Sequence, residues 1–303
     1  MKPDSRPEPE PARRSDRVGR AHLKDPRDGS HTMTRYEPDA DLRDLVQVFW
    51  IPTWEVPPGQ AAPQRVLQHP VCLVVVASDY ARFYGVVPGL STTTLTGRGW
   101  AVGAMLTPAT GFLLAREPVT AYTDRHVGLA ERLGADGTRL TDRVRAAMAA
   151  EPAGPAAHAV AMAAFADVLR PLLPLDAEGE LVNRVVAFVE ETAEVTRVSQ
   201  VCERFEMTER SLQRLVARRP GLTPKWLIQR RRLHEAADRL RGRPIALAEL
   251  ADSLGYADQA HFSRDFSAVT GTTPSRFAAQ HAGDAHQEGI RASEDPAGRM
   301  GPR

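Results

Sequence analysis

The sequence predicts an α+β protein of two domains, a β-rich domain followed by connecting helices and an all-α C-terminal domain. Three observations support this: short β-branched and aromatic runs over residues 36–120, Ala-rich stretches with helical spacing over 139–173, and a repeated two-helix pattern over 181–280. The chain has 303 residues, which is long enough for two domains, and its 42% apolar and 25% charged residues are typical of a globular protein.

The two ends of the chain are expected to lie outside these domains. Residues 1–32 are rich in Pro, Glu, Asp and Arg, so we expect a disordered extension, with Met33 as a candidate for the natural start. Residues 282–303 are Gly-, Ala- and charge-rich and are likewise expected to be a disordered tail. No apolar run approaches the roughly 18 residues of a spanning helix, and the first residues lack a signal-peptide core. We therefore expect a cytoplasmic, nucleoid-associated protein that does not bind membranes.

Residues 33–130 are predicted to form the β-rich domain, which would sense a small molecule or dimerise. Gly, Pro and Asp separate its apolar runs at intervals typical of a sandwich or a small barrel. The predicted strands are residues 46–51, 71–76, 82–87, 91–96 and 100–105.

Residues 131–178 are predicted to form a helical connector. Prolines at 152–155 should divide it into two helices, and prolines at 171–174 should end the second. The apolar residues at helical spacing, expected to face inward, are Leu140, Val144, Met148, Val160, Ala164 and Val168.

The C-terminal domain, residues 179–281, contains a helix-turn-helix pattern near its end. Gly255 supplies a tight turn between two short helices, because glycine adopts a positive φ at little cost. The second helix should bury Phe262 and Phe266 and expose a polar face, and Gly271 should end it. The outer face comprises Ala260, Ser263, Arg264 and Ser267.

The same pattern occurs 50 residues earlier: Arg214 corresponds to Arg264, and Gly221 to Gly271. Thr208 should cap this earlier helix, whose outer face consists of Arg210, Gln213, Arg214 and Arg218. Arg and Gln side chains match the edges of guanine and adenine. Phe205 stands where the second unit has Gly255, so the first turn lacks its glycine.

A predicted helix of 18 residues, 224–241, joins the two units. At 1.5 Å per residue it spans about 27 Å, near the roughly 34 Å of one duplex turn. Residues 210–243 hold eleven Lys and Arg against two acidic residues, and Arg230, Arg231 and Arg232 suit phosphate contacts. One helix-turn-helix pattern alone is often just two packed helices, but two copies at a fixed offset favour DNA binding. His261 could equally pack, contact a phosphate or read a base, and Trp226 is expected in the core.

Residues 181–280 resemble the DNA-binding domain of the AraC family of transcriptional regulators. The resemblance rests on residues 255–266, on Gly271 and Pro274, and on residues 211–215. It implies seven helices, with base contacts from Arg210, Gln213 and Arg214 and from Gln259, Ser263 and Arg264. Ala260 occupies a position where a longer polar residue often reads DNA, so the second unit should be the poorer reader. The N-terminal strands look like the cupin-like sensor domains that often precede this module.

Catalytic patterns are weak. His69 and His126 are far apart in sequence, so we expect no metal and no cofactor. Cys72 lies in an apolar run and is expected to be an inert buried thiol, and we expect both Cys72 and Cys202 to be reduced. No GxSxG motif, phosphate loop or Pro-Cys-His centre occurs.

The sequence therefore predicts a one-component transcription regulator, not an enzyme, that acts by binding promoter DNA. The expected partners are RNA polymerase, a small-molecule effector and a second copy of the chain. The alternatives are an effector-blind DNA-binding protein whose N-terminal domain binds a partner protein, and a cupin-like enzyme fused to a DNA-binding domain. A ligand that raises the melting temperature would separate the first two.

Overall fold

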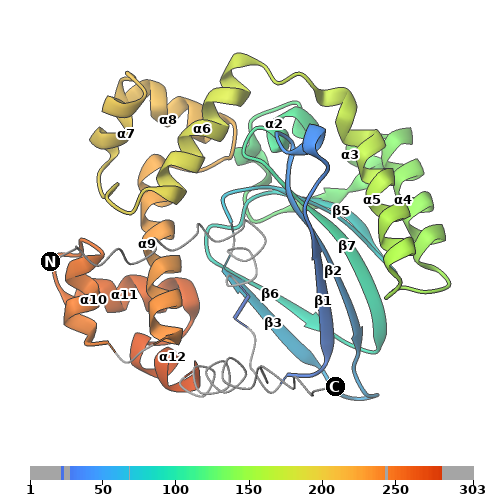
Figure 1. The fold of residues 1–303 in the computed structure, drawn as a ribbon, viewed down its shortest axis with the longest axis horizontal. Helices are drawn as coiled ribbons and strands as arrows, with labels where there is room; N and C mark the ends of the chain where they lie inside the picture. Colours follow the sequence, from blue (N-terminus) through green and yellow to red (C-terminus); the bar gives the residue numbers. More distant parts are fainter. Residues whose placement is uncertain (1–21, 24–27, 68, 243–244, 282–303) are drawn as a thin grey trace, which may run out of the picture.

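The computed structural model describes residues 22–23, 28–67, 69–242 and 245–281, and its two parts lie side by side (Figure 1). The predicted tail, 282–303, and most of the predicted extension, 1–32, lie outside the described residues. None of the helices in the described ranges is long and apolar enough to cross a membrane.

The N-terminal part is built on an antiparallel six-stranded sheet in the order β1-β2-β7-β4-β5-β8, with a separate antiparallel pair, β3 and β6. The five predicted strands are all present, and the sequence analysis missed β1, β3 and β8. The strands are β1 (His31–Tyr36), β2 (Val46–Glu55), β3 (Ala62–Leu67), β4 (Leu73–Ala77), β5 (Ala81–Tyr84), β6 (Leu90–Leu95), β7 (Arg98–Leu106) and β8 (His126–Gly128).

The start of this part differs from the expected boundary at residue 33. Strand β1 begins at His31, whose side chain is buried, and Met33 lies inside the strand opposite Pro52 of β2. His22 forms an isolated bridge with Val66. Backbone pairing to β2 and β3 thus orders residues whose composition alone favours disorder.

The predicted connector forms helices that cover one face of the sheet (Figure 1). Phe165 of one helix meets Phe49 of β2 edge to face, with ring centroids 5.8 Å apart. The predicted break is present, because the second long helix begins at Pro155. Short helices before them connect the strands. The helices are α2 (Thr110–Ala115), α3 (Leu129–Leu133), α4 (Ala135–Met148) and α5 (Pro155–Leu169), with short 3-10 turns η1 (Ala40–Leu42), η2 (Val119–Tyr122) and η3 (Arg170–Leu172).

The inward face of α5 differs from the prediction. Leu140, Val144 and Met148 of α4 are buried as expected, but Val160 of α5 is 53% exposed. Ala164 is buried as predicted and Val168 is half-buried against the core, and Ala161, Phe165 and Leu169 occupy the other inward positions of α5. The bulky Phe165 sets the rotation of this helix, because it fills more of the core than Val160 could.

The C-terminal part contains seven helices within the described residues 177–281, in agreement with the number that the resemblance implies. The long central helix has the predicted 18 residues. Thr208 caps α8 through its side chain, as predicted, and Thr223 and Asp258 cap α9 and α11 in the same way. The helices are α6 (Ala177–Glu191), α7 (Val198–Arg204), α8 (Glu209–Arg218), α9 (Pro224–Arg241), α10 (Leu247–Ser253), α11 (Gln259–Thr270) and α12 (Pro274–His281).

The hydrophobic core clusters do not coincide with the two domains predicted from the sequence. One continuous cluster joins the sheet and α4–α6 to the first helix-turn-helix unit, including Leu212, Val216 and Ile228. The second unit has its own cluster around Phe262, Phe266 and Phe277, to which β3 contributes Leu67. The first unit is thus packed into the N-terminal core, whereas the second has a core of its own.

Gly221 and Gly271 end α8 and α11 with φ values of 77° and 71°, as the repeat predicts. Their surroundings differ. A Cβ on Gly221 would lie 3.0 Å from the Val119 carbonyl carbon in η2, whereas one on Gly271 would meet only Leu90 Cδ2 at 3.7 Å.

Gly271→Ala should therefore lower the free energy of unfolding by about 1–2 kcal/mol, the cost of a left-handed alanine. Gly221→Ala should cost about 2–4 kcal/mol, because overpacking against backbone adds to that strain. Denaturant unfolding of the two variants beside the wild type measures both. Equal losses would show that the contact between Gly221 and η2 is absent in solution.

Candidate nucleic-acid interface

The first candidate recognition helix, α8, has one buried and one exposed face. Leu212, Leu215 and Val216 are buried, while Arg210, Gln213 and Arg214 are exposed. Gln213 donates to Glu209 Oε1 at 3.2 Å. No ion pair or hydrogen bond of the Arg210 or Arg214 side chain is found within the described residues. Two arginines and a glutamine therefore lie on one solvent-facing surface.

The second candidate recognition helix, α11, presents fewer long side chains. Phe262 and Phe266 are buried, Gln259, Ala260 and Arg264 are exposed, and Ser263 is half-buried. His261 is about half exposed; its Nε2 lies 3.7 Å from Asp265 and its ring packs edge-on against Tyr256. The structure thus places Gln259, Arg264 and His261 at the surface. Because the exposed side chain of Ala260 is a methyl group, this face of α11 has fewer hydrogen-bonding groups than the exposed face of α8.

The turns of the two units have the same backbone form, which corrects the alignment made from sequence. Glu206 has a φ of 52° and Gly255 a φ of 72°. In each turn the next amide donates 2.9 Å back into the first helix, from Met207 to Cys202 and from Tyr256 to Ala251. The counterpart of Gly255 is therefore Glu206, not Phe205. The second turn is one residue longer before its capping Asp258.

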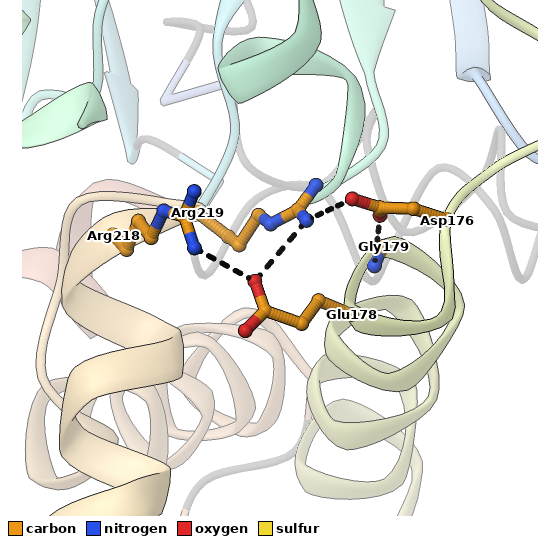
Figure 2. A network of polar contacts seen from close by, with 5 residues as sticks. All are labelled: Asp176, Glu178, Gly179, Arg218 and Arg219. Atoms are coloured by element: carbon orange, nitrogen blue, oxygen red, sulfur yellow. Dashed lines mark hydrogen bonds and ion pairs between the residues drawn. The ribbon is translucent and has the colours of Figure 1, made fainter. Parts of the chain in front are cut away.

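Two arginines at the end of α8 bind the start of α6 (Figure 2). Arg219, whose side chain is 1% exposed, pairs with Asp176 and, at 3.2 Å, with Glu178. Arg218 pairs with Glu178 at 3.1 Å. Both guanidinium groups lie over the Phe112 ring of α2, at 4.7 Å for Arg218 and 4.4 Å for Arg219. Arg218, predicted to contact DNA, is thus held against α6 and α2, because Glu178 and Phe112 offer it a partner on each side.

The carboxylate of Asp176 has two roles. It caps α6 by accepting from the Gly179 amide at 2.7 Å, and it accepts from Arg219. The hydrogen bond from Arg219 holds the pKa of Asp176 below its usual value, helped by the Gly179 amide. We call Arg219, Asp176, Glu178 and Phe112 the α6–α8 clamp.

The predicted phosphate contacts of Arg230 and Arg231 are wrong for this structure, because both side chains are buried. Arg230 donates to the Leu67 carbonyl at 2.8 Å, across the boundary between the two parts. Arg231 pairs with Glu235 at 2.9 Å and donates to the Val195 carbonyl at 3.1 Å. The neighbouring Arg232 lies 4.0 Å over the Tyr256 ring. This arginine run stabilises the fold because α9 is enclosed by its neighbours.

The remaining side chains singled out from the sequence have structural positions. Cys72 and Cys202 are both free cysteines, and burial raises the pKa of the Cys72 thiol to about 12, as an inert thiol requires. Trp226 packs against the main core and donates to the Pro88 carbonyl at 3.1 Å. His126 packs on Tyr84, and His69 on His234. Within the described ranges, no three His, Cys, Asp or Glu gather as a metal site.

Comparison with known protein families agrees with this geometry. Residues 201–280 match a family described as a helix-turn-helix domain, which spans both units and α9. The C-terminal part is similar to AraC-type helix-turn-helix domains. Residues 34–128, which cover the sheet, match a domain of unknown function, DUF6597.

The curated relatives share this domain. The transcriptional activator RhaS of Escherichia fergusonii is 33% identical over 93 residues, which is 30% of this chain and 34% of the relative. The transcriptional activator RhaR of Cronobacter sakazakii is 28% identical over 98 residues, 32% of this chain and 35% of the relative. The chain thus spans about a third of the length of the curated relatives it matches. Among solved structures, ToxT of Vibrio cholerae is 11% identical with a TM-score of 0.38, covering 83% of this chain and 99% of that one.

Asp176→Asn keeps a capping side chain but removes the charge that Arg219 binds. Near pH 7 it should lower the free energy of unfolding by about 1–2 kcal/mol, a modest value because solvent reaches Asp176. A lowered folded-state pKa stabilises above the unfolded pKa, near 3.9, and that stabilisation disappears as the pH falls through the folded value.

The difference between wild type and Asp176→Asn should therefore shrink below about pH 4. Denaturant unfolding at several pH values measures it, with Asp167→Asn as the control, since Asp167 pairs with an exposed arginine. A constant difference down to pH 2 would contradict the charge role of Asp176.

Proposed function

We propose that this protein is a transcription regulator that binds specific double-stranded DNA sites through α8 and α11. The observation that carries the proposal is the exposure of Arg214 and Arg264 at one repeat position on two capped helices. Arginine in this position can donate two hydrogen bonds to a guanine edge in the major groove. The activity is binding, not catalysis.

The geometry of the central helix supports binding by both units. Helix α9 has 18 residues and is therefore about 27 Å long, comparable with the roughly 34 Å between successive major grooves on one face of a duplex. Because Arg230 and Arg231 are engaged inside the protein and Arg218 pairs with Glu178, phosphate contacts would come from other groups. Arg210 and the exposed Lys225, near the start of α9, are suitable cations.

The two units would contribute unequally to recognition. The face of α8 offers Arg210, Gln213 and Arg214, whereas α11 offers Gln259 and Arg264 beside the short Ala260 and Ser263. Long side chains reach base edges that short ones miss. The first unit should therefore carry more of the sequence specificity.

The relatives named as activators support regulation of transcription, with RNA polymerase as a partner. The N-terminal part would sense a small molecule, pair with a second copy, or both. Its shared core with the first unit supports such coupling, because a ligand there would act on residues packed directly beneath α8. Action on DNA places the protein with the nucleoid in the cytoplasm.

Arg214→Ala should weaken binding at the cognate site by about 1–3 kcal/mol, roughly 5- to 150-fold, and Arg264→Ala should weaken it less. Sites come from genome-wide mapping of bound DNA, and affinity from fluorescence anisotropy at fixed salt. Arg184→Ala, an exposed arginine on α6, is the matched control and should bind normally.

The loss of affinity for random DNA should be smaller than the loss of affinity for the cognate site, because base contacts determine sequence specificity whereas phosphate contacts do not. Unchanged affinity in both Arg214→Ala and Arg264→Ala would refute the assignment of α8 and α11 as the DNA-reading helices.

A further inference from the structure

A cavity of about 360 Å³ lies where three parts of the chain meet. The N-terminal part contributes His69 and Thr107, the linker helix α6 contributes Asn183 and Glu190, and α9 contributes Arg230 and His234. The volume is within the range of small-molecule sites. A ligand in this cavity would touch the sensor part, the linker and the helix between the two DNA-reading units at once.

Arg230 places a buried positive charge in the cavity wall. Its side chain is buried and donates to the neutral carbonyl of Leu67 at 2.8 Å. No carboxylate oxygen lies within ion-pair distance of it in the part of the chain that the structure describes. Burial lowers the pKa of Arg230 to about 9, although the charge of Glu190 partly opposes this. A buried cation without a direct ion pair is costly, and an anionic ligand would relieve that cost.

Two imidazoles accompany this guanidinium. The rings of His69 and His234 lie 5.2 Å apart, and the Nε2 atom of each is buried without a hydrogen-bond partner among the residues that the structure describes. Burial and the charge of Arg230 lower the pKa of His69 to about 3, so this ring is neutral near pH 7. A neutral ring with its proton on Nε2 could donate to a ligand oxygen. Unsatisfied buried polar atoms of this kind indicate a missing partner.

The other charges of the cavity restrict the ligand to one negative charge. Arg231 and Arg239 share the one carboxylate of Glu235, and the described lining as a whole holds four arginines against five carboxylates. Glu190 and Glu191 also line the cavity and would repel a second negative charge. Val186 and Leu227 provide apolar wall for the rest of a ligand.

We propose that this cavity binds a small monocarboxylate, held by Arg230 with His69 and His234. Guanidinium and carboxylate match in planar, two-bond geometry, which favours this anion. The assignment of this ligand as the effector rests on the proposed function. Its binding would stiffen the junction between the N-terminal part and α9, and so bias how α8 and α11 are presented.

The test uses the full chain and four probes at matched ionic strength: acetate, butyrate and benzoate, with benzamide as the neutral match of benzoate. Melting temperature and isothermal titration calorimetry report binding, since a ligand of the native state raises the melting temperature. At least one carboxylate should raise it above the sodium chloride control, and benzamide should not. The proposal would be overturned by the wild-type protein alone if benzoate and benzamide raised the melting temperature equally while acetate and butyrate did not change it.

Two charge-removing variants on α9 locate the site. Arg230→Gln should abolish the carboxylate effect or weaken it at least tenfold, and Lys225→Gln, at an exposed position of α9 outside the cavity lining, should retain it. If Arg230→Gln does not fold, His234→Phe replaces it and should weaken carboxylate binding several-fold. Retention of full carboxylate affinity in the folded variant would overturn the proposal.

A DNA-binding arm separates the two proposals. Anisotropy with the mapped site is measured with and without the best carboxylate. A carboxylate that binds through Arg230 while no specific DNA site exists would sustain the cavity and refute the proposed function. Specific DNA binding without any carboxylate binding would sustain the function and refute the cavity.

Discussion

The buried guanidinium of Arg219 is the constraint on which the arrangement of the molecule depends. It lies at the end of α8 and pairs with Asp176 and Glu178 at the start of α6, under the Phe112 ring. A cation with 1% of its side chain exposed is costly without partners, so α8 and α6 are held together. Because Phe112 belongs to the N-terminal part, the α6–α8 clamp also fixes the first helix-turn-helix unit to that part.

The clamp agrees with the division of the hydrophobic core. The first unit shares one cluster with the sheet, whereas the second is centred on Phe262, Phe266 and Phe277 and meets the N-terminal part through Leu67 and Leu90. The family domain at residues 201–280 spans both units, so the sequence boundary and the packing boundary differ. We therefore expect the second unit to open more readily than the first, and α9, which carries Arg230, connects the two.

Local patterns predicted much of this fold. The cap Thr208, the glycine Gly271 that ends α11 and the length of α9 follow from local sequence chemistry. The exposed positions of Arg210, Gln213 and Arg214 follow from helical periodicity, and their roles on DNA stay predictions. Strand β1 was not predicted, because it is held in place by pairing with β2 and composition does not reveal that pairing.

The errors concern long-range partners. Arg230 and Arg231 were assigned to DNA because arginine on a helix is usually solvated, but Leu67 and Val195 lie far from them in sequence and engage them. The correspondence of Phe205 with Gly255 failed because the second turn has one more residue. The left-handed Glu206 is visible only in the backbone.

The central claim is that the first unit is part of the N-terminal core. Hydrogen exchange of the full chain tests this claim most directly. Amides that open in one cooperative unit share one opening free energy. The account predicts that α8 amides exchange with the same opening free energy as those of β4 and β7, while α10–α12 amides open separately and more readily. Common opening of α8 with α10–α12, independent of the sheet, would contradict it.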